Sequence, residues 1–284
     1  MELGINFGYI CSDSGDRLLE TIIDRAKYAK ELGFTALDFS TNIYRDDWRE
    51  RAYAFRELAD RNGIHVHQTH LPFNRYNRAR SHEEFLPYVS RALEVASILG
   101  AKYSVVHADE YRLPKGEEYD VKRAGNFIYD YLAPIVEDAK RFGVGIAVED
   151  LFEDFTYGKP RSRYTSTMDE LLGIIERFND EAVSCCWDFG HAQVAYGTEG
   201  AFEAFKMAFP YITCTHVHDN YYDKDLHLPP FMGNLDWASH MKYMRENGYK
   251  GNFTYEFVYG KMPPEILHEY LIFVKKIADY LFTL

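Results

Sequence analysis

Four short apolar runs in the second half of the chain each close on side chains that bind metal ions or carry protons. These side chains are Glu149 after GIAV, Asp188 and His191 in SCCWDFGH, His216 in TCTHVHD, and Glu256 in FTYEF. Carboxylate oxygens and imidazole nitrogens bind Mn²⁺, Zn²⁺, Co²⁺ and Mg²⁺, and the donor types alone do not choose among these cations. Donors drawn from several strands indicate a divalent metal site, with Mn²⁺ or Zn²⁺ as first candidates.

Further polar residues lie at the ends of these runs and of other apolar runs. They are His67, His70, His107, Asp109, Asp150, His218 and Asp219. Any one of these alone is more often a helix cap or half of an ion pair. Burial of so many carboxylates and imidazoles costs several kcal/mol each unless the groups are paired or coordinated. The set as a whole therefore favours a metal site. Structural or solvated roles are expected for the remaining histidines His65, His82, His240 and His268.

Eight β-type runs alternate with amphipathic segments and no Pro/Gly/Ser-rich linker interrupts them. The predicted strands are 5–10, 35–40, 65–70, 103–108, 144–150, 183–190, 212–219 and 252–257. The predicted helices are 18–33, 46–62, 82–100, 118–143, 167–179, 199–208, 235–248 and 264–281. This alternation predicts an α/β fold, a (β/α)₈ TIM barrel with a single domain over residues 1–284, whose strand ends meet on one face. A doubly wound sheet is less favoured because no Gly-rich phosphate turn follows the first strand.

Charge and hydropathy restrict the classes of partner. The chain has 44 acidic and 32 basic residues, and its net charge of −12 disfavours nucleic acid as a partner. No run approaches the roughly 18 apolar residues of a membrane span, and the first residues do not resemble a secretory signal. We expect a cytoplasmic protein without a membrane partner, with homo-oligomerisation left open. We also expect buried, reduced thiols at Cys11, Cys185, Cys186 and Cys214.

Several sequence strings resemble those of a known superfamily of barrel enzymes. They are THLPF (69–73), VVH (105–107), VED (148–150), WDFGHA (187–192), HVHDN (216–220), DLHLPP followed by GNLDW (225–237), and YEF (255–257). In this order and spacing the chain resembles the xylose isomerase-like barrel superfamily from its third strand to its eighth. That superfamily holds sugar isomerases, ketose 3-epimerases, inosose dehydratases and the endonuclease IV class.

The resemblance implies a metal held by Glu149, Asp188, His216 and Glu256, with the two glutamates also acting as acid and base on opposite faces of a sugar. A metal bound to a carbonyl and its neighbouring hydroxyl stabilises the enediolate that forms when the carbon between them loses a proton. Two carboxylates can remove that proton and return one to the other face or to the next carbon. The resemblance thus implies isomerisation or epimerisation of a free sugar, keto-sugar or polyol.

The resemblance also implies residues that contact the substrate. Sugar-active members use histidines on hydroxyl groups, which here gives His70, His107, His191 and His227. Aromatic residues at positions that could line the pocket are Tyr9, Phe39, Phe73, Trp187 and Phe231, and of these Trp187 is the candidate substrate-binding residue.

Elimination is an alternative reaction at the same site. The metal and base could expel a β-hydroxyl, so a lyase or dehydratase acting on an inosose or a 3-keto-glycoside stays open. Ketose 3-epimerases carry an Arg shortly after the seventh-strand histidine, whereas HVHDNYYDKD has none. No Gly-rich phosphate cradle follows the seventh or eighth strand, so a free sugar is favoured over a sugar phosphate.

A phosphodiesterase is the alternative from a different class. The endonuclease IV class binds three zinc ions with nine ligands, and the matching residues here are His70, His107, Glu149, Asp188, His191, His216, Asp225, His227 and Glu256. The net charge and the scarcity of basic residues in the loops after the strands favour the sugar hypothesis. A non-catalytic scaffold is disfavoured because both Glu149 and Glu256 are present.

Overall fold

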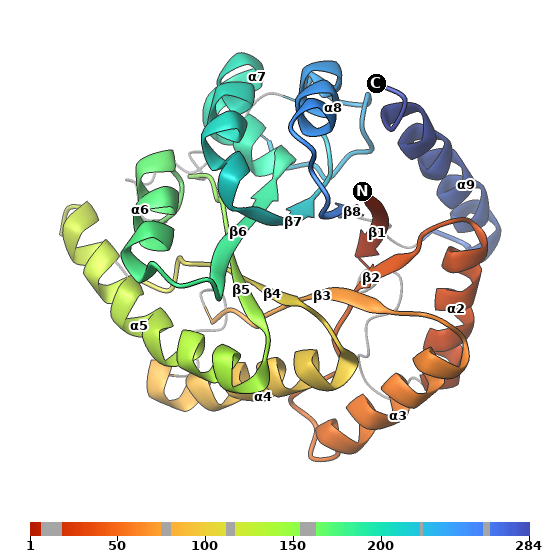
Figure 1. Ribbon diagram of the computed structural model, residues 1–284, viewed down its shortest axis with the longest axis horizontal. Helices are drawn as coiled ribbons and strands as arrows, with labels where there is room; N and C mark the ends of the chain where they lie inside the picture. Colours follow the sequence, from red (N-terminus) through yellow and green to blue (C-terminus); the bar gives the residue numbers. More distant parts are fainter. Residues whose placement is uncertain (7–18, 75–80, 112–116, 154–162, 222–223, 258–261) are drawn as a thin grey trace.

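The β-type runs pair into one parallel sheet that curls round on itself. The computed structural model describes residues 1–6, 19–74, 81–111, 117–153, 163–221, 224–257 and 262–284. The strand order is β7-β6-β5-β4-β3-β2-β1-β8. The amide of Val217 donates to Thr254 O at 2.8 Å and the amide of Glu256 to Val217 O at 3.1 Å, which brings β7 against β8. The predicted (β/α)₈ TIM barrel is confirmed as a single domain (Figure 1).

The strands are shorter than the predicted runs, because the residues at the ends of several runs lie outside the paired ladder. They are β1 Glu2–Asn6, β2 Ala36–Asp38, β3 Val66–His70, β4 Tyr103–Val106, β5 Gly145–Glu149, β6 Val183–Asp188, β7 Ile212–His216 and β8 Asn252–Tyr255. The first strand begins at Glu2, ahead of the predicted 5–10, and positions 7–10 lie outside the described residues.

Helices surround the barrel on its outside (Figure 1). In the described part of the chain they are α2 Leu19–Glu31, α3 Trp48–Arg61, α4 His82–Leu99, α5 Val121–Phe142, α6 Met168–Phe178, α7 Phe189–Ala208, α8 Trp237–Glu246 and α9 Pro264–Leu281, with a 3₁₀ turn η2 at Phe209–Tyr211. Gly100 and Gly143 end α4 and α5 with φ of 80° and 70°, a left-handed conformation that glycine adopts without a steric penalty.

The junction of β6 and α7 differs from the prediction. The sequence predicts a strand through residue 190 and a helix from 199, but the strand ends at Asp188 and the helix begins at Phe189. Asp188 starts the helix because its carboxylate accepts the amide of His191 at 2.8 Å. Gly197, with φ 69° and ψ 174°, interrupts the helix, and this explains why only its second half showed a clear pattern.

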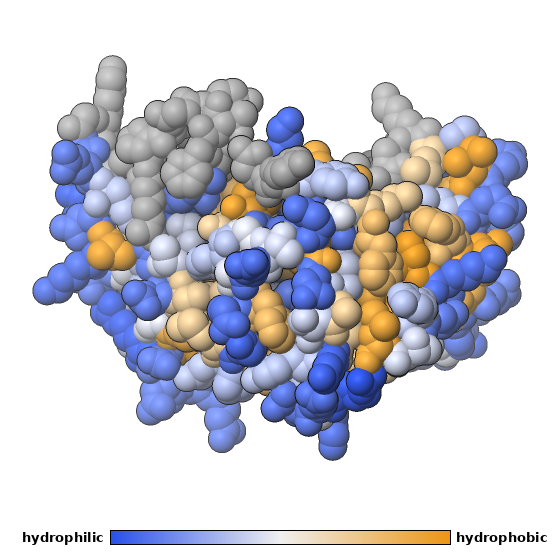
Figure 2. All heavy atoms as spheres, turned by 90° about the horizontal axis from the view of Figure 1, so that it is seen from above, coloured by the Kyte–Doolittle hydropathy of each residue, from blue (hydrophilic) through white to orange (hydrophobic). Residues whose placement is uncertain are grey.

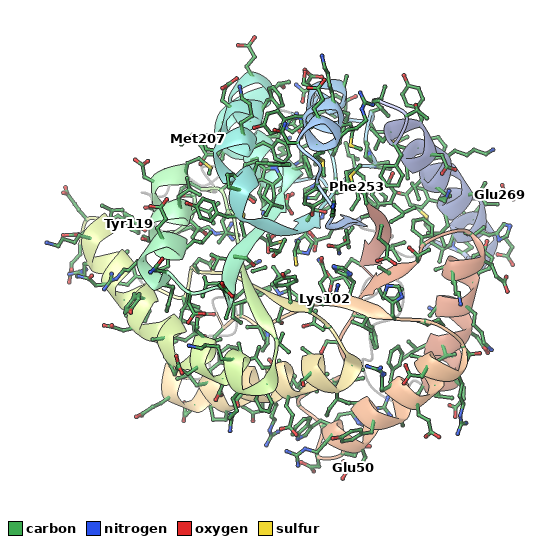
Figure 3. The ribbon with its side chains drawn as sticks, viewed as in Figure 1. Glu50, Lys102, Tyr119, Met207, Phe253 and Glu269 are labelled. Carbon is green, nitrogen blue, oxygen red and sulfur yellow. The ribbon has the colours of Figure 1, made fainter. Side chains whose placement is uncertain are left out.

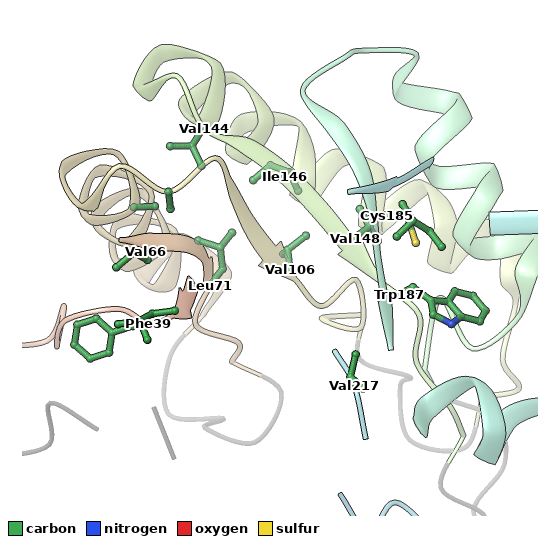
Figure 4. Packing of buried hydrophobic residues seen from close by; sticks show 14 of the residues in the cluster. Phe39, Val66, Leu71, Val106, Val144, Ile146, Val148, Cys185, Trp187 and Val217 are labelled. Atoms are coloured by element: carbon green, nitrogen blue, oxygen red, sulfur yellow. The ribbon is translucent and has the colours of Figure 1, made fainter. Parts of the chain in front are cut away.

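Two apolar layers hold the barrel. A small one fills its lumen and consists of Val105, Ala147, Cys186 and Cys214, all fully buried. A larger one lies between the strands and the helices, and Figure 4 shows part of it around the strands. The alternation of side chains along each strand therefore sends one set into the lumen and the other against the helices.

Exposed side chains are largely polar. Figure 3 shows Glu50 on α3 and Glu269 on α9 projecting from the rim, whereas Phe253 on β8 lies inside the molecule. Hydrophilic side chains cover much of the face seen in Figure 2, with apolar groups in smaller patches between them. Among the described helices, none is long and apolar enough to cross a bilayer. Cys185, Cys186 and Cys214 are free and buried, as expected, and Cys11 lies outside the described residues.

Candidate functional site

A cavity of about 390 Å³ opens at the carboxyl ends of the strands. This is the face on which residues from different strands of a barrel can converge. The described lining residues are Asn6, His70, Phe73, His107, Glu149, Phe152, Arg163, His191, Asp225, His227 and Glu256. Two glutamates, four histidines and an aspartate in one small cavity make it the candidate functional site.

The four donors implied for the metal lie together at the base of the cavity. One donor atom from each of Glu149, Asp188, His216 and Glu256 lies within 4.8 Å of the others. His216 Nδ1 is 3.1 Å from Glu149 Oε1, 3.3 Å from Glu256 Oε2 and 3.9 Å from Asp188 Oδ2. All four residues are at most 7% exposed. The close spacing of oxygen and nitrogen donors fits a single divalent cation.

The charge of this group also fits a cation. Three carboxylates face one imidazole, and buried carboxylates are costly unless an opposite charge compensates them. The guanidinium of Arg163, which also lines the cavity, is engaged elsewhere, because it donates to Asp109 Oδ2 at 3.0 Å and to Phe152 O at 3.1 Å. Burial opposes ionisation of Glu149, but the neighbouring imidazoles of His216 and His107 hold its pKa well below the ordinary value. Glu149 is therefore an anion, as a metal ligand must be.

A carboxylate behind His216 fixes the orientation of its ring. Asp38 Oδ2 lies 3.2 Å from His216 Nε2 and also accepts a hydrogen bond from Gln68 Nε2 at 3.0 Å. With the ring proton on Nε2 donated to Asp38, Nδ1 keeps its lone pair toward the carboxylates. Asp38 was not predicted as a site residue, although it ends the run TALD at the end of β2, just as Glu149 ends β5.

A second donor group lies beside the first and shares Glu149. His107 Nε2 is 3.0 Å and His70 Nε2 is 3.3 Å from Glu149 Oε2. His70 Nδ1 donates to Leu71 O at 2.7 Å, so its Nε2 faces Glu149. Burial lowers the pKa of His107, whereas in His70 the contact with Glu149 outweighs burial and raises the pKa. The two histidines from β3 and the end of β4 thus share one carboxylate oxygen.

A third donor group lies on the other side of the cavity. Asp225 Oδ2 lies 3.3 Å from His227 Nε2 and 3.7 Å from His191 Nε2. Nearby, His218 Nε2 is 2.9 Å from Asp188 Oδ1. Burial alone would lower the pKa of His227, but Asp225 and Glu256 raise it to about 9. His191 Nδ1 is 2.9 Å from Asp150 O, so its Nε2 faces Asp225. The predicted ligands His191, Asp225 and His227 are therefore neighbours.

The loop that carries Asp225 and His227 is organised by one buried carboxylate. Asp219 accepts the amides of Phe231 and Leu235 at 3.0 and 3.1 Å and the indole Nε1–H of Trp237 at 2.8 Å. Asp219 and Leu228 also exchange both backbone hydrogen bonds. These contacts fix the loop over the carboxyl ends of β7 and β8, with the backbone of His227 at a positive φ of 49°.

Comparison with known proteins assigns the fold family. Residues 26–277 match the family model described as the xylose isomerase-like TIM barrel. The chain belongs to the xylose isomerase-like TIM barrel family. The resemblance noted in the sequence is thereby confirmed.

Three similar proteins each share at most 27% of their residues with this chain. An uncharacterized protein of Methanocaldococcus jannaschii is 27% identical over 231 residues, which cover 78% of this chain and 76% of that protein. A crystal structure of a D-tagatose 3-epimerase-like protein has a TM-score of 0.71 at 24% identity and covers 98% of this chain and 100% of that one. The apo structure of the 3-keto-D-glucoside 4-epimerase of E. coli has a TM-score of 0.68 at 18% identity, over 97% and 99% of the two chains.

Trp187 does not fit the role predicted for it. Its side chain is fully buried against Phe205, with ring centroids 5.6 Å apart, and it is not part of the cavity lining. The reason is the alternation of side chains along a strand, because Cys185 and Trp187 of β6 face the same side and both pack in the outer core (Figure 4). The prediction that Trp187 binds substrate is therefore corrected to a role in the core.

The aromatic walls of the cavity come from two other residues. Phe73, as predicted, lines it and stacks on His107 at 4.6 Å, and Phe152 lies 5.1 Å from the ring of His191. Phe39 is buried in the outer core and Phe231, which is 49% exposed, packs on Tyr280. Neither Phe39 nor Phe231 is part of the lining, and Tyr9 lies outside the described residues.

Asn6 and Phe152 were not identified as site residues from the sequence. Asn6 Nδ2 donates to Glu256 Oε1 at 3.3 Å. The predicted first strand placed Asn6 near its start, whereas it is the last residue of β1 and so reaches the cavity. Phe152 follows β5 by three residues, in a loop where no periodic pattern marks an inward direction.

Proposed function

We propose that the protein is a divalent-metal-dependent sugar isomerase or epimerase that moves a proton between carbon atoms with Glu149 and Glu256. The observation that supports this most is the convergence of these two carboxylates, from the ends of β5 and β8, on one cavity. Glu149, Asp188, His216 and Glu256 would hold the cation, Mn²⁺ or Zn²⁺, with Mg²⁺ and Co²⁺ as further candidates. When bound, the cation would polarise a sugar carbonyl and its neighbouring hydroxyl.

The two glutamates would exchange a proton with the carbon next to that carbonyl. One carboxylate accepts the proton, and the other returns a proton to the opposite face or to the adjacent carbon. Asn6 donates to Glu256 at 3.3 Å, and His107 and His70 contact Glu149 at 3.0 and 3.3 Å, so each carboxylate is held in position by a neighbouring side chain. Oriented carboxylates of this kind reduce the entropic cost of reaching the transition state.

The remaining lining suits a small polyhydroxylated substrate. His191, Asp225 and His227 offer polar groups in the cavity wall for hydroxyl groups, while Phe73 and Phe152 supply apolar walls for the carbon faces of a sugar ring. The volume of about 390 Å³ lies in the range of cavities for single small ligands. The similarity of the fold to a D-tagatose 3-epimerase-like protein and to a 3-keto-D-glucoside 4-epimerase supports sugar epimerisation as the reaction class.

Exchange of carbon-bound hydrogen tests the proposal. The protein with Mn²⁺ is incubated in D₂O with a panel of ketoses, inososes and 3-keto-glycosides, and each sugar is analysed by NMR and mass spectrometry. We expect deuterium at the carbon next to the carbonyl of at least one sugar. A product lighter by one water would instead identify the lyase alternative. Absence of deuterium and of any product with every sugar would contradict proton abstraction.

Glu256→Gln tests the assigned acid and base. The amide cannot take up a proton, so turnover of an accepted sugar should fall by about 10²-fold or more. Glu246→Gln is the matched control, because Glu246 is an exposed residue at the end of α8 and should leave turnover unchanged. Unfolding of both variants is compared by circular dichroism. A fully active Glu256→Gln variant would disprove the role proposed for Glu256.

A trinuclear zinc phosphodiesterase is the second candidate, and one observation favours it. The two flanking groups, with His70 and His107 on one side and Asp225 and His227 on the other, provide nitrogen and oxygen donors at close spacing. Clustered cations suit attack on a phosphodiester. Cleavage of DNA with an abasic site in the presence of Zn²⁺, with zinc bound at all three groups, would support this candidate. Zinc at the central group alone, without cleavage, would exclude it.

A further inference from the structure

Three potential metal ligands lie at the end of the barrel opposite the cavity. Glu2 begins β1, His65 directly precedes β3, and His67 is the second residue of β3. His65 Nε2 is 2.9 Å from Glu2 Oε1, and His67 Nδ1 is 3.8 Å from Glu2 Oε2. One donor atom from each residue lies within 4.8 Å of the other two. We call these three residues the floor triad.

A β-bulge places His67 in this triad. Leu37 of β2 pairs with Val66 and the next residue, Asp38, pairs with Gln68, so His67 is an extra residue on β3. Val66 packs in the outer core (Figure 4), while Gln68 donates to Asp38 in the lumen. Val66 and Gln68 are two residues apart and would face the same side of a regular strand, so strict alternation could not produce both orientations. A bulge typically redirects a side chain in this way. The bulge therefore brings His67 to the same end of the lumen as His65.

The lumen between the floor triad and the cavity is filled. The fully buried side chains of Val105, Ala147, Cys186 and Cys214 occupy it, with Tyr103 packed against them. A hydrogen-bonded row from Asp38 through Gln68 to Asn252 crosses the barrel as well. The floor triad therefore shares no ligand with the donor groups of the cavity.

We propose that Glu2, His65 and His67 bind a zinc ion or a similar borderline divalent cation at the floor of the barrel. A tetrahedral zinc with bonds of about 2.0 Å needs donor atoms about 3.3 Å apart, and the distances of 2.9 and 3.8 Å bracket this value. An ion pair alone accounts for the contact of His65 with Glu2. His67 Nδ1, at 3.8 Å from Glu2 Oε2, is too far for a hydrogen bond but close enough to share a cation with that carboxylate.

Exposure leaves room for the remaining coordination position. The side chains of His65, Glu2 and His67 are 50%, 37% and 13% exposed, so water can complete the coordination sphere from the solvent side. Two imidazoles and one carboxylate suit zinc better than Mg²⁺ or Ca²⁺, which prefer oxygen ligands. A cation here would join β1 to β3 across β2, and its role would be structural.

A difference in zinc content tests the proposal. The untagged chain and the variants His65→Gln and Glu2→Gln are dialysed against Zn²⁺ at neutral pH and analysed for bound zinc. The cavity ligands are present in all three proteins, so each variant should hold one zinc ion fewer per chain. His268→Gln, which removes an exposed imidazole on α9, is the control and should hold as much zinc as the wild type. Equal zinc in all four proteins would overturn the proposal.

A second measurement uses the wild-type chain, so that folding of a variant does not decide the result. Histidine side-chain NMR signals assigned to His65 and His67 are followed during a zinc titration. We expect both to shift together with one binding curve that His268 does not show. Signals of His65 and His67 that stay in place while zinc binds elsewhere would contradict the floor site.

Discussion

At the scale of single residues, the partners of the proposed metal ligands matter as much as the ligands. Glu149, Asp188, His216 and Glu256 each close an apolar run, and the family resemblance implied that these four hold one metal. Asp38 could not be singled out, because its role depends on the 3.2 Å contact with His216, two residues 178 positions apart in the chain. The sequence pattern shows which side chains end strands but not which of them face each other across a barrel.

Asp38→Asn should weaken the metal site while leaving its ligands in place. The amide can present its NH₂ group to His216 Nε2, which favours the wrong ring tautomer and removes a negative charge from the back of the ring. Metal affinity should fall by about 10–100-fold, as is usual for the loss of such a partner. Isothermal titration with Mn²⁺ measures the change, and Asp24→Asn on the exposed side of α2 is the control. Unchanged affinity would disprove the assigned orientation of His216.

Protonation of His240 makes a separate prediction about stability and pH. This buried histidine on α8 packs against Phe202 and Phe205, and burial lowers its pKa to about 4 from the usual 6.5. The unfolded chain therefore takes up the proton first as the pH falls. Stability is complete above pH 6.5 and decreases between about pH 6.5 and 4, by about 3 kcal/mol for this residue.

Denaturant unfolding at several pH values measures this effect. His240→Gln should be less stable at all pH values, because glutamine lacks the ring that packs on Phe202 and Phe205. The stability of this variant should nevertheless fall less between about pH 6.5 and 4 than that of the wild type. His268→Gln, on the exposed side of α9, should keep the wild-type dependence. Parallel curves for wild type and His240→Gln would show that His240 is not held neutral.

At the scale of elements, the start of α7 couples the fold to the site. Asp188 ends β6, caps α7 through the amide of His191, and accepts His218 Nε2 at 2.9 Å. The sequence could not place this boundary, because the run WDFGHA is apolar enough to extend the strand. Likewise the bulge at His67 leaves no mark on the residue pattern, since an extra residue shifts the alternation only within one strand.

Gly190 in the first turn of α7 is a sensitive point of this junction. A Cβ there would collide with the imidazole of His218, so Gly190→Ala must displace the ring that contacts Asp188. We expect a loss of about 1–3 kcal/mol in unfolding free energy. Gly173→Ala in α6 is the matched control, because a Cβ there meets nothing within 4 Å.

Gly173→Ala should be neutral or stabilise the protein by about 0.5–1 kcal/mol, since alanine favours a helix interior. Urea unfolding of both variants distinguishes the two sites. Equal stability of the two alanine variants would show that the contact between Gly190 and His218 is not restrictive.

At the scale of the whole molecule, the barrel was predictable because its repeat is long and regular. Eight alternations of a β-type run and an amphipathic segment specify the architecture, and the rule that strand ends share one face brings distant donors together. Which side of a strand a residue faces was less certain, as Trp187 and Asn6 illustrate. A shift of one residue along a strand turns side chains that face the core toward the cavity, and those that face the cavity toward the core.

Anomalous diffraction from crystals soaked with Mn²⁺ and a sugar that the protein turns over tests the central claim most directly. We predict one manganese peak about 2.0–2.3 Å from His216 Nδ1 and from oxygens of Glu149, Asp188 and Glu256. The reacting carbon of the sugar should lie between the carboxylates of Glu149 and Glu256. A cavity in which no peak lies between these four side chains, or in which the sugar carbon contacts neither glutamate, would contradict the account.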